Sequence, residues 1–145
     1  MSRDLHFTRV IAAAPGEVFD AFTAPDGQAA FYGTDDPGWI VRSRCDLRVG
    51  GVWTVEFGPS PGRLYRHDHV FAVIDRPRRI VMTTTETRLD GSSFDTEMEF
   101  TFAPQDGGTL MTMEHRGFPS VELRDEHGIG VPNAFARFER AVRRG

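Results

Sequence analysis

The stretch of residues 131–142 constrains the fold more than any other part of this chain. Its apolar residues recur at i, i+4, i+7 and i+11, which are Val131, Phe135, Phe138 and Val142. This spacing predicts one apolar stripe along an α-helix. A lone helix cannot bury two phenylalanines, and most of the chain before it has the alternation of β-strands. The sequence therefore predicts a sheet that packs against a C-terminal helix.

Strand-like segments fill the middle of the chain, between residues 39 and 116. The clearest covers residues 94–103, where Phe, Thr and Met alternate with Asp and Glu, as in a strand with one buried and one solvated face. Residues 5–11 predict a first strand, and two short helices open at Pro15 and Pro25 because proline suits the first helical turn. The predicted class is α+β, a single domain of residues 1–145 in which a curved antiparallel sheet of about six or seven strands wraps around the long C-terminal helix.

Composition excludes several classes of function. The net charge is -4, so no nucleic-acid partner is expected. All 17 basic residues are arginine, and the lack of lysine excludes Schiff-base chemistry and a P-loop. Cys45 is the single cysteine, so no internal disulfide can form and a reducing, cytoplasmic location fits. No apolar run approaches the length of a membrane span, so no membrane insertion is expected.

Five local motifs occur in an order that resembles the START-like (SRPBCC) superfamily. Within it they resemble the branch named for the C-terminal domain of the activator of heat shock protein 90 ATPase. The motifs are residues 14–22 (APGEVFDAF), 25–32, 46–53 with the turn GGVW, 75–81 (DRPRRIV) and 108–118 (GTLMTMEHRGF). The resemblance implies a helix-grip fold over nearly the whole chain.

One departure from that branch lies in the last helix. The family usually has Gly-Trp there, and this chain has Gly130, Val131 and Pro132. Because proline lacks an amide donor and clashes with the preceding turn, we expect the helix to break near residues 128–130 and to restart at Pro132. A valine in place of the larger tryptophan is also expected to enlarge the cavity.

The resemblance implies a groove between helix and sheet that holds a small apolar molecule. It does not imply a reaction, because members include lipid carriers, metabolite binders, polyketide cyclases and chaperone regulators. We therefore expect a ligand-binding protein without a cofactor. The alternatives are an enzyme of the polyketide cyclase or dehydratase type and, last, a module that regulates a chaperone ATPase. Aromatic residues such as Trp39 would serve either a homodimer interface or the core.

Hairpin geometry predicts which side chains line this groove. A five-residue loop at 89–93 would pair residue 86 with 96, 84 with 98 and 82 with 100, and a four-residue loop at 104–107 would pair 96 with 115, 98 with 113 and 100 with 111. A slip of one residue would reverse the faces, so the alternation favours these registers. The residues expected to bind the ligand are Phe31, Trp53, Met82, Glu86, Thr96, Met98, Phe100, Met111, Met113, His115, Phe135 and Phe138.

Glu86, Thr96 and His115 are expected side by side at one end of the groove. They would anchor an otherwise apolar ligand, act as an acid–base pair, form a structural hydrogen bond or lie at a solvated strand end. No catalytic residue is assigned, because no serine has the context of a nucleophile motif. No metal site is assigned either: His67 and His69 share one strand face, but no third ligand is indicated and a solvated face is expected.

Overall fold

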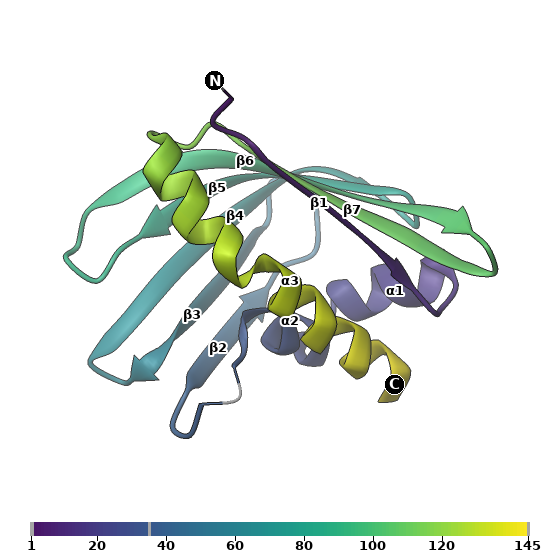
Figure 1. Cartoon of the computed structure of the whole chain (residues 1–145), viewed down its shortest axis with the longest axis horizontal. Coiled ribbons are helices and arrows are strands. Elements are labelled where there is room, and N and C mark those ends of the chain that lie inside the picture. The colour runs from purple at the N-terminus through teal and green to yellow at the C-terminus, as the bar shows by residue number, and fades with distance from the viewer. Residues whose placement is uncertain (1, 35, 145) are drawn as a thin grey trace.

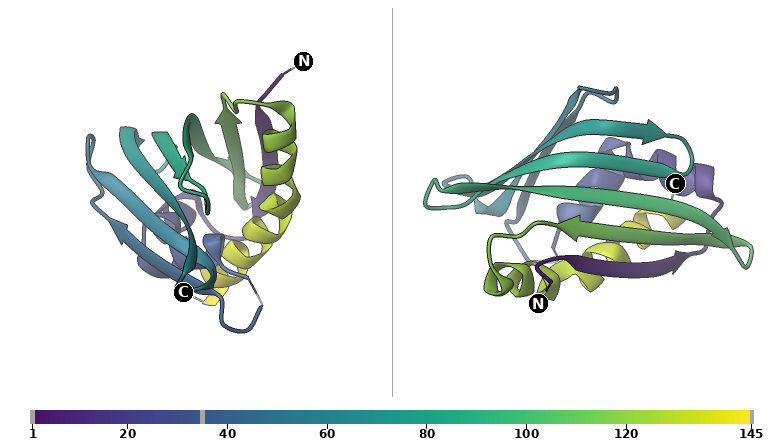
Figure 2. Two further views of the ribbon diagram at one scale, coloured as in Figure 1. Left: turned by 90° about the vertical axis from the view of Figure 1, so that its left-hand side faces the viewer. Right: turned by 90° about the horizontal axis from the view of Figure 1, so that it is seen from above.

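A seven-stranded antiparallel sheet curls around a long C-terminal helix (Figure 1). The computed structural model describes residues 2–34 and 36–144. In chain order the elements are β1 (Leu5–Ile11), α1 (Pro15–Phe22), α2 (Pro25–Tyr32), β2 (Ile40–Cys45), β3 (Val52–Ser60), β4 (Arg63–Asp75), β5 (Arg79–Thr87), β6 (Ser93–Gln105), β7 (Gly108–Arg116) and α3 (Val121–Arg144). The strand order is β1-β7-β6-β5-β4-β3-β2, and all three helices lie on the concave side of the sheet (Figure 2). The predicted helix-grip α+β fold is confirmed.

The core lies where the two short helices and α3 meet the sheet. Both α1 and α2 begin with proline in the first turn, and α1 buries Val18, Phe19 and Phe22. The ring of Phe22 is within 4.5 to 6.1 Å, centroid to centroid, of the rings of Phe31, Trp53, Phe100, Phe102 and Phe138. Tilted and edge-on ring pairs at these distances are favourable beyond the area they bury. This cluster fixes the C-terminal half of α3 against the sheet.

The expected break in the last helix does not occur. One helix runs from Val121 to Arg144 with Pro132 inside it, and it bends near its middle (Figure 1). Proline in a helix interior removes one backbone hydrogen bond and displaces the carbonyl four residues earlier, here that of Gly128. Phe135 and Phe138 are fully buried beyond the bend, so their packing keeps the chain helical despite the local cost.

The predicted register between β5 and β6 is wrong by two residues. Met82 pairs with Met98, and Phe100 pairs with Ile80 instead of Met82. The loop has five residues as expected, but β5 ends at Thr87, so the loop begins at Arg88, one residue early. A shift of two residues keeps every side chain on its own face, because the side-chain period of a strand is two.

The register between β6 and β7 is also shifted by two residues. Phe100 pairs with Met113, and Gln105 pairs with Gly108. Only Asp106 and Gly107 form the turn, with positive φ angles of 49° and 79°. These are the angles of a two-residue type I′ hairpin turn, for which Asp-Gly is a favoured sequence. The inward face of the strands is unchanged.

Candidate functional site

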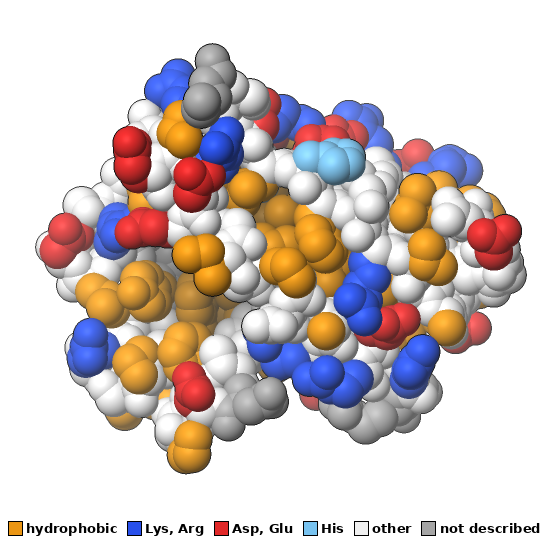
Figure 3. All heavy atoms as spheres, viewed as in Figure 1, with side chains coloured by type: hydrophobic (Ala, Val, Ile, Leu, Met, Phe, Trp, Pro, Cys, Tyr) orange, Lys and Arg blue, Asp and Glu red, His pale blue; other side chains and the backbone are white. Residues whose placement is uncertain are grey.

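A cavity of about 570 Å³ opens between α3 and the inner face of the sheet. Its walls come from α2, α3 and strands β1 and β3 to β7, and hydrophobic side chains gather around the hollow (Figure 3). Val131 and Ala134 line the side formed by α3, so small side chains stand where the helix faces the sheet. A cavity of this size is within the range that holds a small molecule.

Five of the residues expected to bind a ligand line this cavity, namely Phe31, Glu86, Met98, Met113 and His115. The other seven are buried outside its lining: Trp53, Met82, Thr96, Phe100, Met111, Phe135 and Phe138. Six of these pack in the hydrophobic core, and Thr96 supports His115 by a hydrogen bond. The inward face was identified from alternation, but alternation does not separate cavity wall from core.

The histidines of β4 were assigned to the wrong face. His69 is fully buried and His67 is largely buried, whereas Val70, which follows His69, is 42% exposed. The side chains of residues 67, 69 and 71 therefore face inward and those of residues 66, 68 and 70 face outward. The sequence contained the information needed to assign this face. Phe71 belongs to the core, and side chains two residues apart on a strand share a face, so His67 and His69 point inward with Phe71 while Asp68 points outward.

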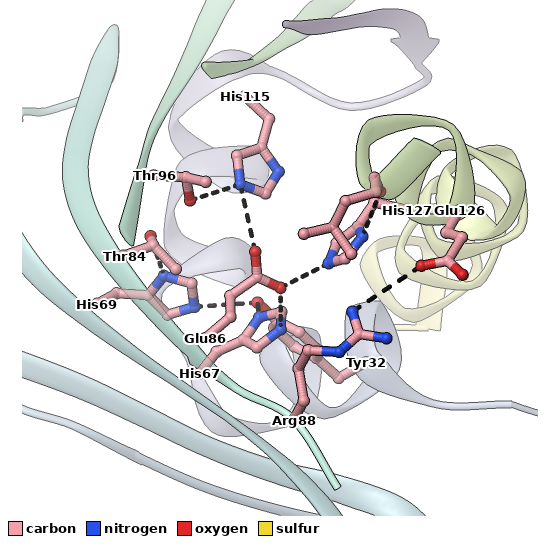
Figure 4. Close-up of polar contacts among 11 residues, drawn as sticks. Tyr32, His67, His69, Thr84, Glu86, Arg88, Thr96, His115, Glu126 and His127 are labelled. Atoms are coloured by element: carbon pink, nitrogen blue, oxygen red, sulfur yellow. Dashed lines mark hydrogen bonds and ion pairs between the residues drawn. The ribbon is translucent and has the colours of Figure 1, made fainter. Parts of the chain in front are cut away.

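Glu86 is the centre of a polar cluster in the wall of the cavity. It is 3% exposed, and its Oε1 atom lies 2.6 Å from Nε2 of His67 and 2.8 Å from Nε2 of His127 (Figure 4). Burial raises the pKa of Glu86, but the hydrogen bonds from His127 and His67 outweigh burial and hold the pKa below its ordinary value. The carboxylate is therefore ionised at neutral pH.

His127, on α3, was not singled out from the sequence. Its Nδ1 atom lies 2.8 Å from the carbonyl oxygen of Leu123, and its Nε2 atom lies 2.8 Å from Glu86. Both partners accept only, so both ring nitrogens carry a hydrogen and the ring is an imidazolium. Burial lowers the pKa of His127, but the bond to Glu86 and its negative charge raise it above the ordinary value overall. Nothing in the sequence relates residue 127 to residue 86, because only the docking of α3 joins them.

Tyr32 connects the remaining two histidines. Its hydroxyl lies 2.9 Å from Nδ1 of His67 and 2.9 Å from Nε2 of His69, and Nδ1 of His69 lies 2.7 Å from the hydroxyl of Thr84. Since Nε2 of His67 donates to Glu86, its Nδ1 atom can accept from the hydroxyl of Tyr32, which can in turn accept from Nε2 of His69. Burial lowers the pKa of His69 and raises the pKa of Tyr32, so both are neutral at pH 7. The cluster thus forms a directed chain of hydrogen bonds that ends at Glu86.

His115 completes the cluster from β7. Its Nε2 atom bonds to the hydroxyl of Thr96 at 2.8 Å and lies 3.7 Å from Oε2 of Glu86. Burial lowers the pKa of His115 to about 4, so this ring is neutral at pH 7. The structure brings Glu86, Thr96 and His115 together as expected, and adds Tyr32, His67, His69 and His127 to them.

The described part of the chain, residues 2–34 and 36–144, contains no group of three or more His, Cys, Asp or Glu residues arranged to hold a metal ion. Across the same residues, none of the helices combines the length and apolar character that a membrane span requires. What the site provides is a largely apolar chamber with the ionised carboxylate of Glu86 and several imidazoles beside it.

The fold and this chamber define a START-like (SRPBCC) protein of the helix-grip type, a fold that commonly binds hydrophobic ligands. Residues 12–143 match the family described as "Activator of Hsp90 ATPase homolog 1-like protein", and the chain belongs to this family. None of the curated proteins matches the chain.

Solved structures from several bacteria share the fold. Protein CV1439 from Chromobacterium violaceum superposes with a TM-score of 0.84 at 22% identity, over 97% of this chain and 96% of that chain. A protein from Staphylococcus epidermidis gives 0.79 at 16% identity, over 99% and 92%. Protein Ms6760 from Mycobacterium smegmatis gives 0.76 at 20% identity, over 97% and 88%. At these identities the likeness shows the fold alone.

Proposed function

We propose that this protein binds a small, largely apolar molecule in the cavity between α3 and the sheet. The observation that carries the proposal is the cavity of about 570 Å³, which the surrounding side chains leave unfilled although the neighbouring core is tightly packed. Interiors of proteins are normally close-packed, so an apolar chamber of this size is a functional feature.

The lining supports an elongated ligand with an apolar body. Trp39, Phe57 and Tyr65 line one wall, and Ile129, which is 80% exposed, lies on the α3 side. Such an exposed isoleucine beside a chamber costs solubility unless an apolar partner covers it. The polar cluster around Glu86 borders the cavity, so a few polar groups would orient an otherwise apolar molecule.

Binding of the neutral fluorescent probe N-phenyl-1-naphthylamine tests the proposal. The wild-type protein is expected to enhance its fluorescence with a saturable, one-site curve. Val131→Trp would place an indole in the cavity and weaken binding by about tenfold or more, which corresponds to roughly 1.4 kcal/mol. Val70→Trp adds the same side chain on the outer face of β4 and should leave binding unchanged. Equal binding by wild type and Val131→Trp would refute the proposal.

Native mass spectrometry of the protein purified from its own host would identify the natural ligand. A stoichiometric adduct, released by denaturing extraction, would give its chemical class. Loss of that adduct in Val131→Trp, with retention in Val70→Trp, would locate it in the cavity.

Acid–base catalysis in the same cavity is the second candidate. It is favoured by the position of Glu86, His115 and Tyr32 beside the chamber, within reach of a bound molecule. Against turnover, two imidazoles hold Glu86 ionised with a lowered pKa, which makes it a weak base. Incubation of the extracted molecule with excess protein would decide: a change in its mass or retention time would indicate turnover.

A further inference from the structure

The second carboxylate oxygen of Glu86 has no hydrogen-bond partner among residues 2–34 and 36–144, although it is buried. Every other buried side-chain nitrogen or oxygen of the described residues has a partner. An ionised oxygen without a partner in a low-dielectric site costs several kcal/mol in general, and such atoms are rare in native proteins. The side chain to which it belongs lines the cavity.

No side chain of the described residues donates a hydrogen bond to this oxygen. Nε2 of His115 lies 3.7 Å away, beyond hydrogen-bond distance, and shares a 2.8 Å hydrogen bond with Thr96. Nε2 of His67 and Nε2 of His127 both lie within hydrogen-bond distance of the other oxygen, Oε1. The hydrogen bonds of His69 and Tyr32 lead through His67 to Oε1 as well.

From this geometry we infer that the ligand carries a neutral hydroxyl or N–H group, which it donates to Oε2 of Glu86. The inference rests on the proposed binding function and specifies its ligand class: an apolar molecule with one hydrogen-bond donor. Figure 4 shows the position of this carboxylate among His67, His115 and His127.

The charge of the site favours a neutral donor over a cation. His127 already carries a positive charge 2.8 Å from Glu86, so the pair is close to neutral. A buried ammonium would lose its hydration with little net Coulomb gain, whereas a hydroxyl loses far less.

Equilibrium dialysis at pH 7 against matched naphthalenes tests this ligand class. The donor probe is 2-naphthol, and its partners are 2-methoxynaphthalene and naphthalene, which lack a donor. A hydrogen bond to a charged group predicts that 2-naphthol binds about 10- to 100-fold more tightly than 2-methoxynaphthalene. The cation 2-naphthylmethylammonium should bind more weakly than 2-naphthol.

Glu86→Gln should abolish or reverse the preference of the cavity for a hydrogen-bond donor. The amide oxygen would stay with the donors on His67 and His127, and the amide nitrogen would replace Oε2. The cavity would then present a donor in place of an acceptor, so the preference for 2-naphthol should disappear or reverse towards 2-methoxynaphthalene. Glu122→Gln, an exposed change in the first turn of α3 outside the cavity lining, should retain the wild-type preference.

The outcomes separate this inference from the proposed function. Equal affinity of the wild type for 2-naphthol and 2-methoxynaphthalene would overturn the inference and leave cavity binding intact. Preference for the ammonium would overturn the neutral-donor assignment. If N-phenyl-1-naphthylamine and all the naphthalenes fail to bind, the proposed function fails as well. Should Glu86→Gln not fold, the wild-type comparison alone decides.

Discussion

Nε2 of His127 on α3 lies 2.8 Å from Oε1 of Glu86 on β5, and this contact joins the helix to the sheet beside the cavity. The two residues are oppositely charged and Glu86 is buried, so water screens their attraction only weakly. The C-terminal half of α3 is held by Phe135 and Phe138, whereas this pair ties its N-terminal half to the sheet. The part of the cavity wall that α3 forms therefore depends on the contact between His127 and Glu86.

Removal of the carboxylate should destabilise the protein strongly. In Glu86→Ala, the imidazolium of His127 and the donor of His67 lose their acceptor inside the fold. Breaking a buried ion pair by deleting one partner costs about 3 to 5 kcal/mol. Urea denaturation would measure the change in the free energy of unfolding. Glu122→Ala, at an exposed position of α3, should change it by no more than about 0.5 kcal/mol, and a similar small effect of Glu86→Ala would contradict the role of the pair.

His127 should make the protein less stable at alkaline pH. Its pKa in the folded protein is raised above 6.5, so its stabilisation is complete below pH 6.5 and is lost as the pH rises through the folded pKa. The free energy of unfolding should therefore fall above pH 6.5, and His127→Gln should remove this decline. NMR titration of the imidazole would check the sign directly: a midpoint below 6.5 would contradict it.

His115 should make the protein less stable at acidic pH. Burial lowers its pKa from 6.5 to about 4, so between these values the unfolded chain binds one proton more than the folded chain. The free energy of unfolding should fall with decreasing pH, with a contribution of up to about 1.4 kcal/mol per pH unit from this group. His69, whose pKa burial also lowers, adds a slope of the same sign.

The comparison of wild type with His115→Gln isolates the contribution of His115. The variant should show a smaller slope between pH 4 and 6.5 while His69 maintains the rest. An unchanged slope would mean that His115 is protonated in the folded state.

Replacement of the proline inside α3 should stabilise the protein. Pro132→Ala restores an amide donor and removes a ring clash worth about 3 kcal/mol in an average helix. It also raises the conformational entropy of the unfolded chain, which opposes this gain by about 0.4 to 1 kcal/mol. A net gain of about 1 to 2 kcal/mol in the free energy of unfolding is expected from these two effects. Asn133→Ala, at the neighbouring exposed position, should change stability by less than about 0.7 kcal/mol. A loss of stability in Pro132→Ala would show that the bend itself is required for packing.

The fold was largely predictable from local patterns. Prolines at the starts of α1 and α2, the alternation in β6 and the apolar stripe of α3 each reflect a short-range rule, and the structure follows all three. The errors in strand register came from turns. The register of β6 and β7 depends on Asp106 and Gly107 as a two-residue turn, a signal present in the sequence that was read as part of a longer loop.

The candidate site was predictable only in part. Glu86, Thr96 and His115 lie on adjacent strands, so alternation placed them on one face and hairpin connection placed them near one another. His127 and Tyr32 reach the same carboxylate cluster from helices, and no periodicity relates a helix residue to a strand residue far away in the chain. The same limit applies to the cavity, because alternation gives the inward direction of Met82 and Met98 alike, and only Met98 reaches the cavity.

The sequence by itself determined the antiparallel sheet, the C-terminal helix and the inward face of β5, β6 and β7, because these depend on periods of 2 and 3.6 residues within one element. Only the tertiary structure decided that α3 continues through Pro132, that it leaves a cavity beside Val131, and that Tyr32, His67, His69 and His127 join Glu86 and His115 in one cluster. Those outcomes depend on long-range packing and on the desolvation of charges brought together from separate elements, which local sequence does not encode.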